Sequence, residues 1–120
     1  MQGRLDEGHA LLEQALGLSL ARHTTPLLTL CLGAFGRLAL AEGEVVRASI
    51  LAGAADGLRR RAGVRAWPMQ RRPETELVAE LRQALAVDAF ERAFATGSRL
   101  SRQEAAATAR NQRDAGLGAA

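Results

Sequence analysis

The sequence lacks several residue types that most domains of its size use. Its 120 residues include no lysine, no tyrosine and one cysteine, and aromatic residues make up 3% of the chain. The single cysteine, Cys31, excludes an internal disulfide and suits a reducing compartment. With few aromatic side chains, the core has to be built from alanine, leucine and valine. No segment shows sustained apolar and polar alternation with β-branched residues, so strands are not expected.

Motifs for catalysis, metal binding and secretion are missing as well. No GxxxxGK[ST] phosphate loop occurs, and His9 and His23 have no cysteine or carboxylate at metal-ligand spacing. Polar and charged residues follow Met1, and no uncharged apolar run reaches the length of a membrane span. We therefore expect a cytoplasmic protein that is not an enzyme and that uses no metal or cofactor.

Two further features could suggest a catalytic site, but each has a simpler explanation. Cys31 lies in an apolar helical segment, which indicates a buried structural thiol. Glu74, Glu76 and Glu80 could suggest a carboxylate site. We interpret them as acidic residues at and after the start of a helix, where they complement its dipole.

What the sequence has in abundance is alanine, the strongest helix former, within a hydrophobic content of 48%. This composition predicts an all-α fold, and the length suits one domain. Apolar residues at helical spacing predict six helices, at about residues 3–21, 25–41, 44–61, 73–85, 88–97 and 101–110.

Local signals predict where these helices begin and end. Starts are expected at Thr25-Pro26, at Pro73, and at two capping boxes, Asp88-x-x-Glu91 and Ser101-x-x-Glu104. Glycines are expected to stop helices at Gly63 and Gly97.

The first half also contains a degenerate repeat. Gly3-x4-Gly8-x6-Ala15 aligns with Gly43-x4-Ala48-x6-Ala55 at an offset of 40 residues. The pattern resembles the second helix of a tetratricopeptide repeat, in which small residues allow close helix packing. We therefore divide the single domain, residues 1–110, into repeat-like hairpins at 3–62 and a three-helix C-terminal subdomain at 73–110. Residues 111–120 are expected to form a disordered tail.

In this alignment the first helix matches the second helix of a repeat whose own first helix is absent. Its leucines would then lack part of their usual cover. We expect an exposed association face formed by Leu5, Leu11, Leu12 and Leu18. This face would be covered by a protein partner, by a second copy, or by the rest of a longer chain.

Most of the chain, about Gly3 to Ala109, resembles a known group of proteins. The residues that carry the resemblance are Ala52-Gly53-Ala54-Ala55, Leu58-Arg59, Ala62-Gly63, Pro68, Leu77, Leu81, Phe90-x-x-Ala93-Phe94, Gly97, Leu100-Ser101, Glu104-Ala105 and Ala109. They are similar to the C-terminal region of large, mainly actinobacterial, LuxR-type ATP-binding transcriptional regulators and their predicted-ATPase relatives. The resemblance implies a helical module that senses or transmits signals. The family's ATPase and helix-turn-helix domains have no counterpart in this sequence, so their activities are not carried over.

One charged segment allows a different interpretation. Six arginines, with no acidic residue among them, form a possible nucleic-acid or partner patch: Arg59, Arg60, Arg61, Arg65, Arg71 and Arg72. Trp67 could provide a stacking platform within that patch. Alternatively, the arginines complement a helix end and a solvated loop, and Trp67 is a buried plug between the two halves.

Three hypotheses about function therefore stay open. The favoured one is a helical interaction or regulatory module without enzymatic activity. The second is a small nucleic-acid-binding protein, whose binding would weaken steeply as salt rises. The third is a gene remnant with no independent role.

Overall fold

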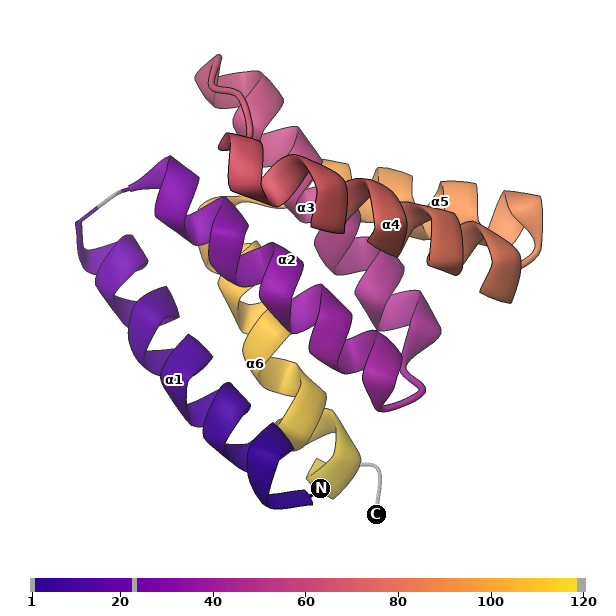
Figure 1. Ribbon diagram of the computed structural model, residues 1–120, viewed down its shortest axis with the longest axis horizontal. Coiled ribbons are helices and arrows are strands. Elements are labelled where there is room, and N and C mark those ends of the chain that lie inside the picture. The colour runs from indigo at the N-terminus through magenta and orange to yellow at the C-terminus, as the bar shows by residue number, and fades with distance from the viewer. Residues whose placement is uncertain (1, 23, 119–120) are drawn as a thin grey trace.

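The computed structural model describes the backbone of residues 2–22 and 24–118 and the side chains of residues 7–22 and 24–110. Six helices account for nearly all of it, and the described residues include no strand (Figure 1). The predicted all-α class is therefore confirmed. The helices are α1 (Gln2–Ala21), α2 (Thr25–Ala41), α3 (Val45–Ala62), α4 (Pro68–Ala84), α5 (Val87–Ser98) and α6 (Arg102–Gly118).

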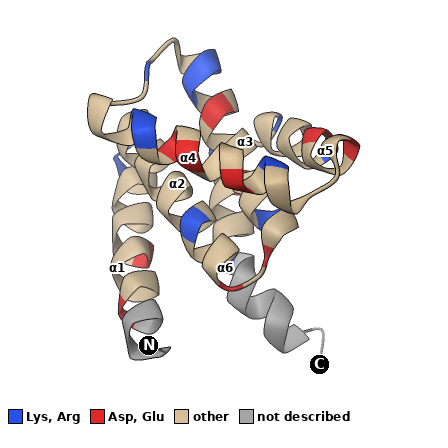
Figure 2. Cartoon of the chain, turned by 45° about the vertical axis from the view of Figure 1, so that its right-hand side comes forward, with Lys and Arg blue, Asp and Glu red and all other residues tan. Residues whose placement is uncertain are grey.

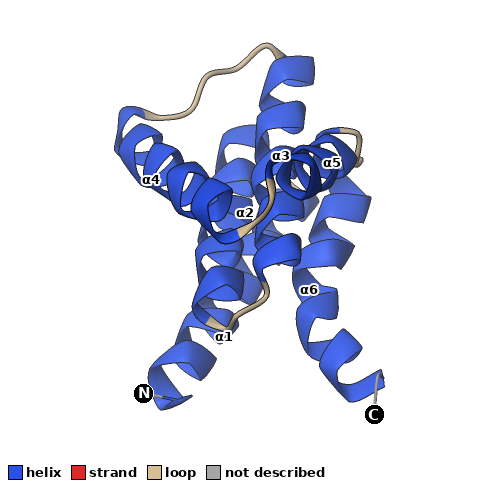
Figure 3. Ribbon diagram, turned by 90° about the vertical axis from the view of Figure 1, so that its right-hand side faces the viewer, coloured by secondary structure: helices blue, strands red, loops and turns tan. Residues whose placement is uncertain are grey.

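Helices α2 and α3 form the centre of the molecule, and the other four pack on them. Helices α1 and α6 lie on one side, where they also contact each other. Helices α4 and α5 lie on the other side (Figure 3). Buried side chains accordingly form two clusters. One joins α1, α2, α3 and α6 around Leu16, Leu32 and Phe35, and the other joins α2 to α5 around Leu81 and Phe90.

Helices α3 and α5 cross in close backbone contact. Gly53 and Gly57 are one turn apart on α3 and lie against the backbone of Phe94 and Ser98 on α5. Gly97 of α5 lies in the same way against Ile50. Glycine is needed at these three positions because a Cβ would overlap backbone atoms of the facing helix.

This crossing corrects the prediction that Gly97 ends a helix. Gly97 is buried inside α5, and Arg99 is the residue at the C-terminal cap. The predicted box at Asp88 is also wrong, because α5 begins at Val87 with Ala86 at the N-cap. By contrast, Gly63 does end α3, with a left-handed backbone at φ 69°.

The capping box at the start of α6 is confirmed. The backbone N–H of Ser101 donates to Glu104 Oε1 at 2.8 Å, and the backbone N–H of Glu104 donates to Ser101 Oγ at 3.0 Å. These two bonds satisfy donors that a helix start otherwise leaves free.

We expect Ser101→Ala to lower the free energy of unfolding by about 1 kcal/mol, because the N-cap acceptor is lost. Asp88→Ala is the control, since Asp88 caps nothing, and its effect should stay below about 0.5 kcal/mol. Urea unfolding followed by circular dichroism measures both changes. Equal losses in the two variants would contradict the assignment.

Helix α4 begins earlier than the sequence predicts. Pro68, rather than Pro73, is its first residue, and Pro73 lies inside the helix. Proline tolerates the first helical turn because its missing N–H is not needed there. Residues 63–67 form the loop before α4 (Figure 3). Gln70 Oε1 accepts a hydrogen bond from the backbone N–H of Trp67 at 2.9 Å. Trp67 therefore marks the start of a helix rather than a position within a long loop.

Helix α2 starts at Thr25 as predicted, although Thr24, not Thr25, is its N-cap.

Helices α4, α5 and α6 do not form a bundle of their own. Each packs mainly on the central pair, and α6 lies on the opposite side from the other two. The tetratricopeptide-like arrangement stays a prediction. Helix α6 continues to Gly118, into the segment expected to be a tail, and the side chains of residues 111–120 lie outside the described part.

Candidate functional site

The outer surface of α1 carries exposed apolar side chains. Leu11 is 67% exposed and Leu18 is 47% exposed, and the two are seven residues apart on one helix face. Leu12, from the same predicted face, instead packs against the core. The side chain of Leu5 lies outside the described residues. The structure therefore brings two of the four predicted leucines together in a narrow stripe.

Polar residues lie between the two leucines and beyond each of them. Glu7, Gln14 and Arg22 are exposed. Their spacing from the two leucines places Glu7 and Gln14 on the same side of α1, and Arg22 continues that side in the turn after Ala21, where its N–H still bonds the Leu18 carbonyl. The outer stripe of α1 thus consists of Glu7, Leu11, Gln14, Leu18 and Arg22. An acidic residue lies near one end and a basic residue near the other.

The inner side of α1 is held by specific contacts. Leu16 and Ser19 are fully buried, and Glu13 pairs with Arg110 of α6 at 3.3 Å. His9 is buried, and its Nε2 lies 3.2 Å from Glu42 Oε2 at the turn after α2. These contacts fix the rotation of α1 about its own axis. They therefore determine which residues face outward.

The predicted arginine patch does not form one continuous surface. Both terminal nitrogens of Arg59 bind the carboxylate of Glu74. Arg60 pairs with Asp56 at 2.8 Å, and Arg61 donates to the backbone carbonyls of Ser98 and Leu100. All three guanidinium groups are thus engaged within the chain.

The other three arginines have different surroundings. Arg72 pairs with Glu76 at 3.2 Å, and Arg71 donates through Nε to the carbonyl of Ala66 at 3.3 Å. Arg65 is exposed in the loop before α4. Figure 2 shows acidic and basic residues interspersed along α4. The interpretation of Trp67 as a buried plug is wrong, because its side chain is 38% exposed.

The three carboxylates of α4 are explained by pairing rather than by a helix start. Glu74, Glu76 and Glu80 each have a separate arginine partner, namely Arg59, Arg72 and Arg37. They do not lie in the first turn, because α4 begins at Pro68. No local sequence signal indicates the pair of Arg59 and Glu74, whose members come from different helices.

The described residues contain no cluster of three or more potential metal ligands. Burial raises the pKa of the Cys31 thiol, because the thiolate would lose its hydration. The thiol form is therefore favoured, and the nucleophilic thiolate is suppressed.

No family model matches the chain, and neither a curated protein nor a solved structure matches it. None of the helices in the described part is long and apolar enough to cross a lipid bilayer.

Proposed function

We propose that this protein is a non-enzymatic interaction module whose binding surface is the outer stripe of α1, and that a second copy of the chain binds there. The observation that carries the proposal is the exposure of Leu11 and Leu18 one heptad apart on a helix whose other side is anchored. Exposed apolar residues in a row of this kind are typical of helix pairing.

The sequence of the stripe fits an antiparallel pair of α1 helices. Around a two-fold axis near Gln14, Leu11 of one copy lies opposite Leu18 of the other. The same axis places Glu7 opposite Arg22, so opposite charges meet at both ends of the contact. A two-fold pair uses the same patch on both subunits, and the stripe satisfies that requirement.

A regulatory context for this module comes from its resemblance to the C-terminal region of LuxR-type ATP-binding regulators. Pairing through α1 would then bring two copies of such a region together. The nucleic-acid alternative has less support, because three of the six arginines of its patch pair with carboxylates and Arg61 donates to two backbone carbonyls through its terminal nitrogens.

Sedimentation equilibrium over a range of protein concentrations tests the pairing. One helix face is a small interface, so we expect a weak dimer with a Kd of about 10 μM to 1 mM. Leu18→Glu should abolish it, because a carboxylate would face Leu11 of the second copy. Val87→Glu is the matched control, since Val87 is 73% exposed on α5, away from the stripe. It should leave the dimer unchanged.

Charge exchange tests the antiparallel register. Glu7→Arg and Arg22→Glu should each weaken the dimer several-fold, and the double variant should restore it. A chain that stays monomeric at all concentrations would overturn the proposal. Failure of the double variant to restore pairing would overturn the register.

A further inference from the structure

A cavity of about 360 Å³ lies between α3, α4 and α5. Its volume is within the range of small-molecule sites in proteins, roughly 300 to 1,000 Å³. Helix α3 contributes Ala52 and Ala55, whose small side chains leave the space open, and α4 forms the facing wall. The cavity is separate from the outer stripe of α1.

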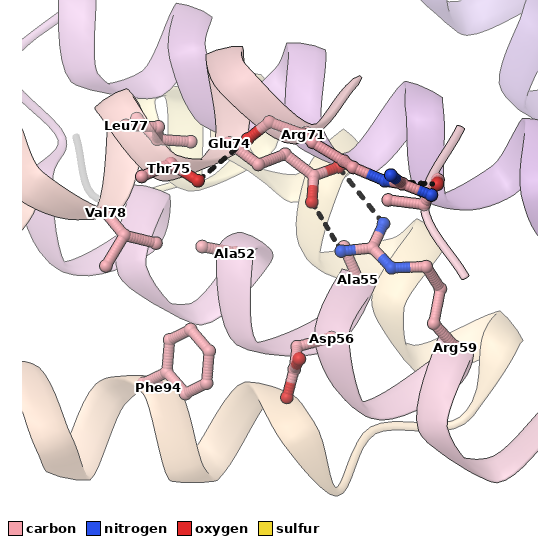
Figure 4. Close-up of a pocket in the computed structure, with 12 residues that line it drawn as sticks. Ala52, Ala55, Asp56, Arg59, Arg71, Glu74, Thr75, Leu77, Val78 and Phe94 are labelled. Carbon is pink, nitrogen blue, oxygen red and sulfur yellow. Dashed lines mark hydrogen bonds and ion pairs between the residues drawn. The ribbon is translucent and has the colours of Figure 1, made fainter. Parts of the chain in front are cut away.

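The lining of the cavity is divided by polarity (Figure 4). Leu77, Val78 and Phe94 lie at one end, which is apolar. The guanidinium groups of Arg59 and Arg71 lie at the other end, together with the carboxylate of Glu74. A ligand that fits this lining has an apolar body and a charged or polar head.

The charges at the polar end of the cavity determine which charge the head group of a ligand should carry. The carboxylate of Glu74 binds both terminal nitrogens of Arg59, and Asp56 binds Arg60. Arg71 uses only its Nε, which donates to the carbonyl of Ala66. Among the described residues, its terminal nitrogens have no acceptor. The cavity therefore presents one uncompensated cation to a ligand.

We propose that this cavity binds a small amphiphile with an anionic head group, such as a medium-chain carboxylate. Arg71 pairs with the head group, and the tail lies against Leu77, Val78 and Phe94. Guanidinium binds carboxylate through two parallel hydrogen bonds, which gives the site its preference for an anion. The site does not depend on pairing through α1.

Isothermal titration calorimetry with three eight-carbon probes tests the proposal. Octanoate, octanol and octylamine share one tail and differ in the charge of the head group. Octanoate should bind saturably at or below about 1 mM, and octylamine should bind at least tenfold more weakly. Trp67 provides a second readout, because it is the only tryptophan of a chain without tyrosine and adjoins the lining residue Ala66.

Three variants separate this site from non-specific binding. Arg71→Gln should weaken octanoate about tenfold and leave octanol unchanged. Arg72→Gln is the matched control, because Arg72 is the neighbouring residue, is highly exposed and does not line the cavity. Ala52→Leu should fill the space and weaken octanoate and octanol alike, with a melting temperature that confirms folding.

Several results would overturn the proposal. These are no saturable binding of octanoate, equal binding of all three probes, or equal losses in Arg71→Gln and Arg72→Gln. Unchanged octanoate affinity in a folded Ala52→Leu variant would also overturn it. Leu18→Glu should bind octanoate normally, so failure of this site and failure of α1 pairing remain distinguishable.

Discussion

Replacing Gly97 with alanine is expected to lower the free energy of unfolding by about 3 kcal/mol and the melting temperature by roughly 12 °C. An added Cβ at this position would lie 2.8 Å from the carbonyl carbon of Ile50 and 2.9 Å from the backbone nitrogen of Ala54. It would be closer still to the carbonyl oxygen of Ile50. These are backbone atoms, so relief requires that α3 and α5 move apart.

The sign of this effect is informative because helix propensity predicts the opposite. Within an isolated helix, replacing glycine with alanine stabilises by roughly 0.5 to 1 kcal/mol. Gly17→Ala is the matched control, since Gly17 lies in α1. Among the described side chains, its added Cβ would have one neighbour, Arg110 at 3.8 Å. We expect Gly17→Ala to be neutral or stabilising.

Gly53→Ala should behave like Gly97→Ala, because its Cβ would overlap the carbonyl group of Phe94. The losses of the two variants should not add fully when combined, since one separation of α3 from α5 relieves both overlaps. Thermal and urea unfolding measure the stability of the parent and of these four variants. A Gly97→Ala variant as stable as the parent would show that α3 and α5 do not cross in this way.

Replacing Glu74 with glutamine is expected to lower the free energy of unfolding by about 2 kcal/mol and the melting temperature by roughly 8 °C. The side chains of Arg59 and Glu74 are only 12% and 22% exposed. Removal of the carboxylate therefore leaves a poorly hydrated guanidinium without its counter-ion. The pair also joins α4 to α3, so its loss should loosen the wall of the cavity.

An exposed pair that also joins α4 to another helix provides the control. Arg37 and Glu80 lie 2.6 Å apart, but their side chains are 42% and 53% exposed. Water screens such a pair, so Glu80→Gln should cost less than about 0.5 kcal/mol. A double variant with methionine at positions 59 and 74 should recover most of the stability that Glu74→Gln loses, because neither charge remains. Equal losses for Glu74→Gln and Glu80→Gln would contradict this account.

Much of the fold is visible in local sequence. Alanine content and apolar spacing predict the all-α class, and the positions of the first three helices follow from the same pattern. Gly63 and the box of Ser101 and Glu104 are correct because such signals act within one turn of backbone. The predicted start of α4 at Pro73 is wrong because two prolines, Pro68 and Pro73, carry the same local signal.

The candidate sites also divide into features that the local sequence predicts and features that only the tertiary structure shows. The exposed leucines of α1 could be anticipated from their spacing, although only packing shows that Leu12 faces the core. Gly97 looked like a helix stop, whereas its role is to let α3 approach α5, a contact between positions far apart in the chain. The arginines resemble one patch in the sequence because their acidic partners, Asp56, Glu74 and Glu76, all lie outside the segment.

Short-range chemistry in this sequence is thus sufficient for the class of fold, most of the first three helices and the composition of the core. Those features depend on propensity, periodicity and capping, which act within a few residues. The crossing of α3 and α5, the burial of the pair of Arg59 and Glu74 and the cavity beside it depend on how the helices meet. Their energies come from close packing and desolvation between distant segments, which no local pattern records.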